Sequence, residues 1–178
     1  MKEYNNKKTS IVYHGNVIDD SVMIGHFVLI RENNIIKKNV RIGSYTEIAH
    51  HTSIGENVHI HSGCFIPEFT ILKKDCWIGP HVTFVNDIYP QTGGEYREGV
   101  IVQPNAIIGA KSTIMAGVTI GAGAVIGCGS VVLKNVPAGE VWAGNPAMFI
   151  KFRKDIKGKR FQKQIWRDSL WQKIMEED

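Results

Sequence analysis

The sequence has few cysteines, few aromatic residues and no long apolar run. Its three cysteines, Cys64, Cys76 and Cys128, are an odd and unclustered set, and only 9% of the residues are aromatic. Cys64 and Cys76 stand two residues before Ile66 and Ile78, so we expect small buried thiols there in place of disulfide bridges or metal ligands, and no metal. No stretch reaches the roughly 18 apolar residues that a membrane helix needs. A charged start followed by an apolar run is also missing, so we expect no secretory signal and a cytoplasmic setting.

Charge of one sign does not dominate either. The formal net charge is +4 over 178 residues, of which 43% are hydrophobic, and this suits one folded domain with an appendage. Basic residues gather at 151–163, as a nucleic-acid or membrane-surface role would require. The aromatic interleaving and base-reading motifs of nucleic-acid modules are missing, however. We therefore predict no nucleic-acid partner and no membrane partner.

A period of six runs through most of the chain. An aliphatic residue, or Phe84, recurs every sixth residue from Val12 to Val132, and the count misses only at Pro90 and Tyr96. This period fits neither an ordinary helix nor an ordinary strand. It indicates a repeat architecture.

Two more positions of the hexapeptide are restricted. If the aliphatic position is i, the residue at i−2 is usually small or β-branched, so both side chains point to the same side of a short strand. A glycine at i+1 then turns a corner, where φ is unusual or backbones crowd. Six residues thus make one flat side and one corner of a prism with parallel strands stacked on each side. The glycines are Gly25, Gly43, Gly55, Gly79, Gly109, Gly121 and Gly127.

This pattern resembles the hexapeptide-repeat, left-handed parallel β-helix family over residues 10 to 150. The resemblance implies an all-β fold in which three hexapeptides make one triangular coil, giving about six coils. It also implies left-handed winding, an exception to the usual crossover preference. We expect an N-terminal arm at 1–10, the β-helix at 11–150 with an extruded loop at 86–101, and a basic segment with an α-helix at 151–178.

The last coils and their exit, Val-Trp-Ala-Gly-Asn-Pro-Ala at 141–147, resemble the C-terminal signature of the family's CoA-dependent acyltransferases. The resemblance implies acetyl-CoA as co-substrate. Ala110 and Cys128 are eighteen residues apart, so they stack and leave backbone amides for the pantetheine arm. Lys134, Lys151 and Arg153 suit the phosphates of CoA. Alternatively, the glycines only turn corners and the lysines form a solvated face.

The loop entrance at 78–90 resembles a run in the galactoside, maltose and antibiotic acetyltransferases of this fold, but Tyr89 stands where those enzymes have a histidine. A sugar hydroxyl needs a base in the transition state. An amine with a pKa of about 8 is partly free base at neutral pH. The departure at Tyr89 therefore favours an amine acceptor.

The motif Asn-Asp-x-Tyr-Pro resembles the branch that N-acetylates nucleotide-linked (dTDP or UDP) 3-amino-dideoxy sugars for surface polysaccharide such as lipopolysaccharide. By this resemblance Asn86 and Asp87 orient the amino group or accept its proton, and Tyr89 lines the substrate pocket. The alternative is that these residues only start an extruded turn.

His81 is the first candidate for a general base, because it lies three residues after Ile78 and near the loop; a purely binding role is the alternative. Glu47 and His61 are expected to face outward, towards a neighbouring subunit, and to bind substrate. The family forms homotrimers with active sites between subunits, and we expect the same assembly. Surface or interface roles are expected for His50, His51 and His59.

Three other functions compete with this interpretation. One is an O-acetyltransferase that acts on a sugar or serine hydroxyl, with His81 as base. Another is a non-catalytic hexapeptide-repeat domain used for assembly. A zinc hydrolyase of the γ carbonic anhydrase type needs two histidines five residues apart, and no two of the seven histidines have that spacing.

Overall fold

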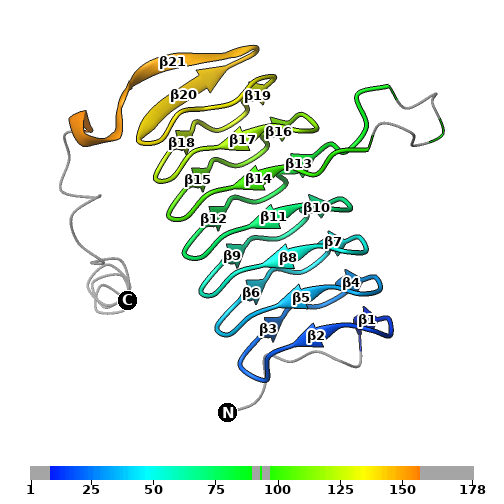
Figure 1. Cartoon of the computed structure of the whole chain (residues 1–178). Coiled ribbons are helices and arrows are strands. Elements are labelled where there is room, and N and C mark those ends of the chain that lie inside the picture. Colours follow the sequence, from blue (N-terminus) through cyan, green and yellow to red (C-terminus); the bar gives the residue numbers. More distant parts are fainter. Residues whose placement is uncertain (1–8, 90–92, 94–96, 157–178) are drawn as a thin grey trace, which may run out of the picture.

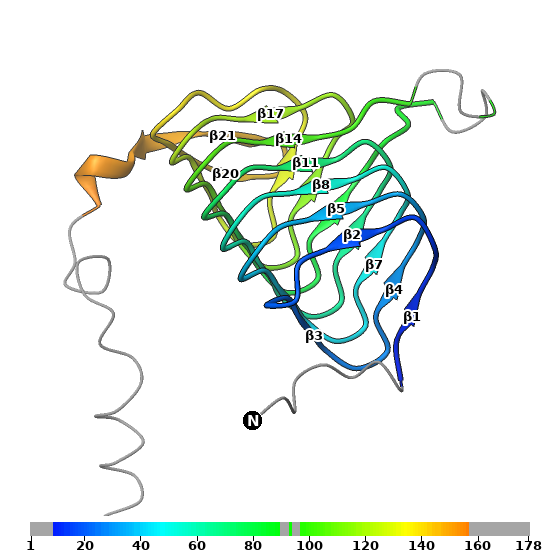
Figure 2. The same cartoon turned by 60° about the horizontal axis from the view of Figure 1, so that its bottom comes forward.

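The computed structural model describes residues 9–89, 93 and 97–156 as a left-handed parallel β-helix. Nineteen two-residue strands, β1 to β19, follow one another with three to a coil, which gives six full coils and one further strand. The coils are stacked along one axis (Figure 1), and the cross-section is a triangle (Figure 2). The predicted fold class is confirmed.

Three sheets form the sides of the prism, and each is named after its first strand. The β1 sheet contains β1 (Ile11–Val12), β4 (Leu29–Ile30), β7 (Glu47–Ile48), β10 (Phe65–Ile66), β13 (Thr83–Phe84), β16 (Thr113–Ile114) and β19 (Val131–Val132). The β2 sheet contains β2 (Val17–Ile18), β5 (Ile35–Ile36), β8 (Ser53–Ile54), β11 (Ile71–Leu72), β14 (Ile101–Val102) and β17 (Thr119–Ile120). The β3 sheet contains β3 (Met23–Ile24), β6 (Arg41–Ile42), β9 (His59–Ile60), β12 (Trp77–Ile78), β15 (Ile107–Ile108), β18 (Val125–Ile126), β20 (Glu140–Gly144) and β21 (Ala147–Phe152).

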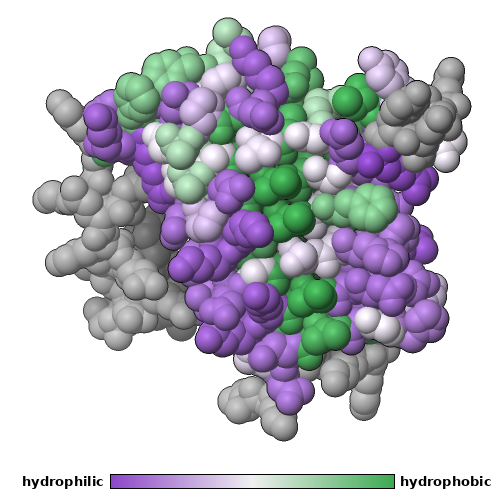
Figure 3. Space-filling view, in the orientation of Figure 1, coloured by the Kyte–Doolittle hydropathy of each residue, from purple (hydrophilic) through white to green (hydrophobic). Residues whose placement is uncertain are grey.

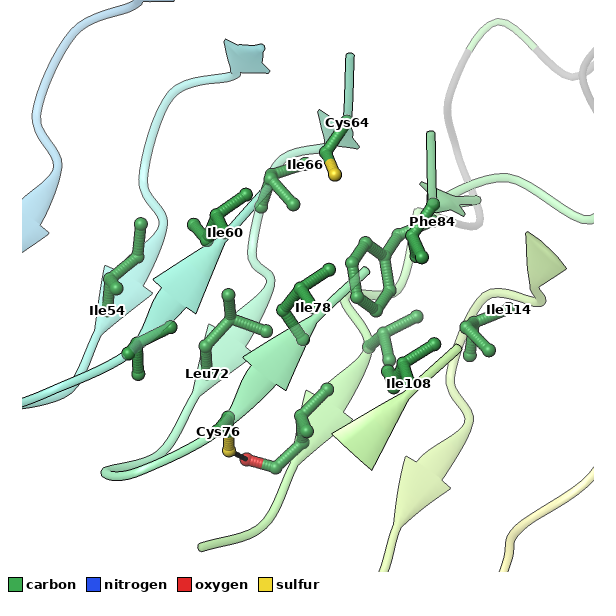
Figure 4. Packing of buried hydrophobic residues seen from close by; sticks show 14 of the residues in the cluster. Ile54, Ile60, Cys64, Ile66, Leu72, Cys76, Ile78, Phe84, Ile108 and Ile114 are labelled. Atoms are coloured by element: carbon green, nitrogen blue, oxygen red, sulfur yellow. Dashed lines mark hydrogen bonds between the residues drawn. The ribbon is translucent and has the colours of Figure 1, made fainter. Parts of the chain in front are cut away.

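The core is a single column of aliphatic side chains along the prism axis. From Ile24 onward, each position i in a strand, such as Ile54 or Ile78, is almost fully buried, and so is the residue at i−2, such as Val58 or Val82. The side chains converge from the three sheets (Figure 4). Cys64 and Cys76 lie in this core as free thiols at position i−2. Packing of this kind stabilises the fold by about 1.5–3 kcal/mol for each fully buried aliphatic side chain.

The corners depend on two different backbone positions. The glycines at i+1 are required by crowding: a Cβ at Gly43 would lie 2.3 Å from the backbone nitrogen of Ser62 in the next coil. Positive φ falls at i+3 instead, where glycine is often absent. Glycine is therefore needed at i+1 because backbones crowd there, and not because φ is unusual. The non-glycine residues at i+3 with φ between 55° and 63° are Phe27, Asn33, Asn39, Tyr45, His51, Asn57, Phe69, Asp75, His81, Asn105 and Lys111.

The predicted loop leaves the prism between β13 and β14 (Figure 1). Strands stacked on one another are normally eighteen residues apart, as Ile71 and Ser53 are, but Ile71 pairs with Ile101 at a separation of thirty. The loop therefore adds twelve residues, two full periods, to one coil. This explains why the six-residue count resumes in step after two misses.

Beyond β19 the regular coils end in an antiparallel hairpin. Strand β20 continues the β3 sheet beside β18, and β21 turns back along it through the cis peptide bond Asn145–Pro146. A short 3-10 helix, Arg153–Asp155, follows. The hairpin thus runs past residue 150, where the prism was expected to end. The α-helix predicted within 151–178 falls largely on residues 157–178, outside the described residues.

The outer side of the β2 sheet carries an apolar band that runs along the prism (Figure 3). Val17 and Ile35, the outward residues of β2 and β5, are 67% and 49% exposed. Across the described ranges, 9–89, 93 and 97–156, no helix is long and apolar enough to cross a membrane.

Candidate functional site

Most of the predicted site residues border one side of the prism, the outer face of the β1 sheet, whose strands β1, β4 and β7 are labelled in Figure 2. One corner leads from the β3 sheet into this face, and we call it the entry corner. The other leads from this face towards the β2 sheet, and we call it the exit corner. The entry corner holds His81, Ala110 and Cys128; the face itself holds Glu47; the exit corner holds Asn86, Asp87, Tyr89 and Lys134.

His81 occupies the entry corner immediately before β13. It is exposed and has φ of 57°. Its imidazole lies over Gly63, one coil earlier: a Cβ at residue 63 would meet Nδ1 of His81 at 2.4 Å. Asn86 and Asp87 lie at the other end of β13, on the exit corner. The structure therefore places the predicted base and the predicted amide–carboxylate pair on opposite edges of one face.

The loop begins and ends in a short antiparallel stem at the exit corner. The backbones of Asp87 and Arg97 form an isolated antiparallel β-bridge, and the backbone nitrogen of Glu98 donates to the carbonyl of Asn86 at 2.9 Å. One carboxylate oxygen of Asp87 accepts a hydrogen bond of 2.7 Å from the backbone nitrogen of Tyr89. The Tyr89 side chain is 65% exposed. Asp87 thus shapes the turn, as the alternative interpretation has it, and the phenol of Tyr89 is open to solvent.

A column of polar side chains supports this stem. His50, Glu68 and Asn86 are each eighteen residues apart, so they stack on the exit corner. The amide of Asn86 donates to one carboxylate oxygen of Glu68. The other carboxylate oxygen accepts a hydrogen bond of 3.2 Å from Nη1 of Arg97, and it lies 3.4 Å from Nε2 of His50. The Glu68 side chain is only 15% exposed.

Sequence reasoning missed Glu68 and assigned His50 and His51 to a surface or interface. Nδ1 of His50 lies 2.8 Å from Nδ1 of His51, and both rings contact Phe69, with centroid distances of 6.1 and 6.2 Å. The eighteen-residue spacing of His50, Glu68 and Asn86 is a signal in the sequence that could have revealed the column.

Glu47 and His61 lie on different sides of the entry corner. Glu47 is the outward residue of β7 and accepts a hydrogen bond of 3.1 Å from Nε of Arg31. His61 follows β9 on the β3 side, where its ring is 4.6 Å from that of Trp77. Burial lowers the pKa of His61. Burial also lowers the pKa of the neighbouring His59, with smaller effects of Arg41 and His61.

Ala110 and Cys128 stack in successive coils of the entry corner, as expected from their spacing. The backbone nitrogen of Gly129 donates to the carbonyl of Ala110 at 2.8 Å. Cys128 is exposed, whereas burial raises the pKa of both Cys64 and Cys76 to about 11. Of the three thiols, Cys128 alone is therefore open to solvent.

The three predicted phosphate-binding cations make different contacts. Lys134 follows β19 and lies 5.3 Å from the ring centroid of Trp142. Lys151 is an exposed residue of β21. Nη1 of Arg153 donates to the backbone carbonyls of Asn105 and Gly123, at 2.7 and 2.9 Å, so this nitrogen ties the segment after β21 to the prism. In the described part of the chain, no group of three or more His, Cys, Asp or Glu side chains could hold a metal ion.

Comparisons with known proteins agree with the repeat and the fold. The family described as "Bacterial transferase hexapeptide (six repeats)" matches residues 35–68 and 99–134, on either side of the loop. None of the curated protein sequences matches the chain.

Several solved structures share the fold. A presumptive acetyltransferase of Bacillus cereus is 26% identical, with a TM-score of 0.68 over 86% of this chain and 92% of that protein. The polySia-specific acetyltransferase NeuO is 25% identical, with a TM-score of 0.60 over 94% of this chain and 78% of NeuO.

A third structure is AntD, an N-acyltransferase of Bacillus cereus solved with dTDP-4-amino-4,6-dideoxyglucose and coenzyme A. It is 21% identical, with a TM-score of 0.66 over 95% of this chain and 91% of AntD, and it shows the shared fold. In its repeat and its prism fold the chain is thus similar to hexapeptide-repeat transferases, including the acetyltransferases named above.

Proposed function

We propose that the protein transfers an acetyl group from acetyl-CoA to the amino group of a nucleotide-linked 3-amino-dideoxy sugar. The nucleotide is dTDP or UDP, and the product serves surface polysaccharide biosynthesis in the cytoplasm. The observation that carries the proposal is that the outer face of the β1 sheet has the candidate acceptor-binding residues on one edge, at the exit corner. The small residues Ala110 and Cys128 lie on its other edge, at the entry corner. NeuO, an acetyltransferase specific for polySia, supports a saccharide acceptor.

On this face, acetyl-CoA passes the small side chains of Ala110 and Cys128, and Lys134, Lys151 and Arg153 serve its phosphates. Arg153 contributes through the donors other than Nη1, since guanidinium carries five N–H groups. The acceptor sugar lies between the two corners, with Glu47 and Tyr89 as contacts. His61 faces the other side of the entry corner, so its role as a substrate contact would involve a neighbouring copy.

The reaction joins the amine nitrogen to the thioester carbonyl carbon. A tetrahedral oxyanion results, and a backbone amide at a corner is the kind of donor that stabilises it. The C–S bond then breaks and the thiolate of CoA leaves. Asn86 and Asp87 orient the amine, and its proton passes to His81, to Asp87 or to the departing thiolate. We propose no metal in this chemistry.

The active unit is a homotrimer with sites between subunits. The apolar band over the β2 sheet supports association, because such an exposed band on a monomer marks an interaction surface. Light scattering of the purified protein measures the mass directly, and a monomer at working concentration would contradict the trimer.

A thiol-release assay tests the function. Acetyl-CoA is offered with a panel of dTDP- and UDP-linked amino sugars and with matched sugars that carry a hydroxyl in place of the amine. Turnover of an amine is expected. Turnover of hydroxyl sugars alone would replace the proposal by O-acetyl transfer, and failure to bind acetyl-CoA in calorimetry would favour an assembly role.

A further inference from the structure

Two aromatic rings stack on the entry corner. Phe27 lies between β3 and β4, and Tyr45 lies one coil later, between β6 and β7. Their ring centroids are 5.2 Å apart, and the ring planes are 19° from parallel. Phe27 is 55% exposed and Tyr45 is 67% exposed. The pair is therefore a flat aromatic surface that faces solvent at the edge of the β1 face.

Local conformational preference does not account for this pair. Both residues occupy position i+3, with φ of 55° at Phe27 and 61° at Tyr45. A bulky side chain rarely adopts a positive φ, whereas asparagine does so more readily. At four other i+3 positions the chain has asparagine, namely Asn33, Asn39, Asn57 and Asn105. Bulky residues that go against a local preference are expected where they serve a ligand.

The pair lies beside the acceptor side of the proposed active site. Glu47, the outward residue of β7 and a proposed acceptor contact, comes two residues after Tyr45. Gly63 and His81 follow Tyr45 in the next two coils of the same corner, and the His81 ring leans back over Gly63, towards the coil of Tyr45. Successive coils are about 4.8 Å apart, so Tyr45 and His81 are separated by about 10 Å along the prism axis.

We propose that Phe27 and Tyr45 bind the base of the nucleotide-linked acceptor by stacking. The inference rests on the proposed function. Exposed aromatic side chains bind a base through its flat face, without reading its hydrogen-bonding edge. The linkage from the base to the sugar of a dTDP or UDP sugar contains about ten covalent bonds of roughly 1.5 Å each, so one molecule can reach from Tyr45 to His81.

This arrangement gives the two substrates separate parts of one corner. Ala110 and Cys128, which we propose border the pantetheine arm, come after His81 in the entry corner, whereas Phe27 and Tyr45 come before it. Acetyl-CoA then approaches His81 from the C-terminal coils and the nucleotide approaches it from the N-terminal coils. The amino sugar lies between them, on the face that holds Glu47.

The first test measures binding and needs no turnover. Calorimetry follows the titration of dTDP and of UDP into the full-length protein, with inorganic pyrophosphate as the probe that lacks a base. Tyr45→Asn should weaken nucleotide binding by about 5- to 150-fold, the range expected from the loss of one base–aromatic stack. Tyr45→Phe keeps the ring and should bind as the unmodified protein does. Pyrophosphate should bind equally to all three proteins.

The matched control is Phe69→Asn. Phe69 also occupies i+3, with φ of 63°, and is 47% exposed, but it lies on the exit corner against His50 and His51. Because the chain has asparagine at other i+3 positions, both asparagine variants should fold. Phe69→Asn should bind nucleotide normally. An equal loss of binding in Phe69→Asn would show that a change of corner backbone, and not the missing Tyr45 ring, was responsible.

The second test uses the amine that the thiol-release panel identifies. Tyr45→Asn should lower kcat/KM for the nucleotide-linked amino sugar by the same factor as binding. With the same amino sugar freed of its nucleotide, the variant and the unmodified protein should be equal, because no base is present to stack. KM for acetyl-CoA should not change. A loss of acetyl-CoA affinity in place of nucleotide affinity would assign the pair to the adenine of CoA and overturn the inference.

The outcomes separate this inference from the proposed function. If no amine is acetylated, the proposed function fails, and the nucleotide titrations still decide whether the pair binds a base. If an amine is acetylated but Tyr45→Asn binds and turns over the nucleotide sugar normally, the inference fails alone. Binding of neither dTDP nor UDP would also overturn it. A fall in mass by light scattering, with nucleotide binding unchanged, would assign the pair to a contact between copies.

Discussion

The imidazole of His81 lies directly over Gly63, so close that a Cβ on residue 63 would come within 2.4 Å of Nδ1 and 2.5 Å of Cε1. Gly63 also has φ of +72°, a conformation that other residues rarely adopt. Both facts follow from the stacking of coils, which brings residues eighteen apart into contact. The missing side chain at residue 63 therefore determines where the His81 ring rests.

Gly63→Ala should destabilise the protein and displace His81. The positive φ alone costs a non-glycine residue about 1–2 kcal/mol, and the clash with the imidazole adds to it. Gly139→Ala is the matched control, because Gly139 has φ of +70° and nothing within 4 Å of an added Cβ. Urea denaturation measures both free energies of unfolding. Equal losses in the two variants would contradict the contact between His81 and residue 63.

Glu68→Ala should lower the free energy of unfolding by about 1.5–3 kcal/mol, the usual range for hydrogen bonds to a charged group. The carboxylate is mostly buried and accepts hydrogen bonds from the side chains of Asn86 and Arg97. Glu56→Ala is the control. Glu56 pairs with Lys38 at 3.5 Å, but both side chains are largely exposed, so its removal should cost at most about 1 kcal/mol. A loss at Glu68 no larger than at Glu56 would show that Glu68 does not hold the stem.

Much of the prism is predictable because it is dictated by burial. Ile78 and Cys76 point inward for the same reason as their equivalents in every other coil, and one hydrophobic period reveals them all. The loop was also predictable, since the period fails at Pro90 and Tyr96. Its insertion of twelve residues keeps the later coils in phase.

The corner conformations and the polar column could not be derived in the same way. Phe27, Tyr45 and Phe69 adopt positive φ at i+3 although their own preference is against it. The packed coils impose that conformation, so local propensity gives no sign of it. Spacing alone could place Glu68 beside His50 and Asn86, but the direction of each side chain depends on the stem that Arg97 completes.

Lowering the pH below about 6.5 should destabilise the protein in part through His61. Burial lowers the pKa of this histidine in the folded state. In the window between that lowered pKa and the value of about 6.5 in the unfolded chain, the unfolded state binds more protons. Stability therefore falls as the pH falls through this window and stays complete above it. His61→Gln should flatten the fall in unfolding free energy just below about pH 6.5, and an unchanged slope would refute the assignment.

Cys128 should be the thiol that alkylates first, and acetyl-CoA should protect it. Burial raises the pKa of Cys64 and Cys76 to about 11, so at pH 8 they are both shielded and protonated, whereas Cys128 is exposed. Mass spectrometry after brief treatment with iodoacetamide should find label on Cys128 alone, and on all three cysteines after unfolding.

If the pantetheine arm passes Cys128 as proposed, acetyl-CoA at ten times its Kd should slow the labelling about tenfold by mass action. Acetyl-CoA is the suitable ligand because its sulfur is acylated and consumes no reagent. Cys128→Ser is the control and should abolish the fast labelling. Unchanged labelling of Cys128 in the presence of acetyl-CoA, with binding verified by calorimetry, would move the cofactor path away from the entry corner.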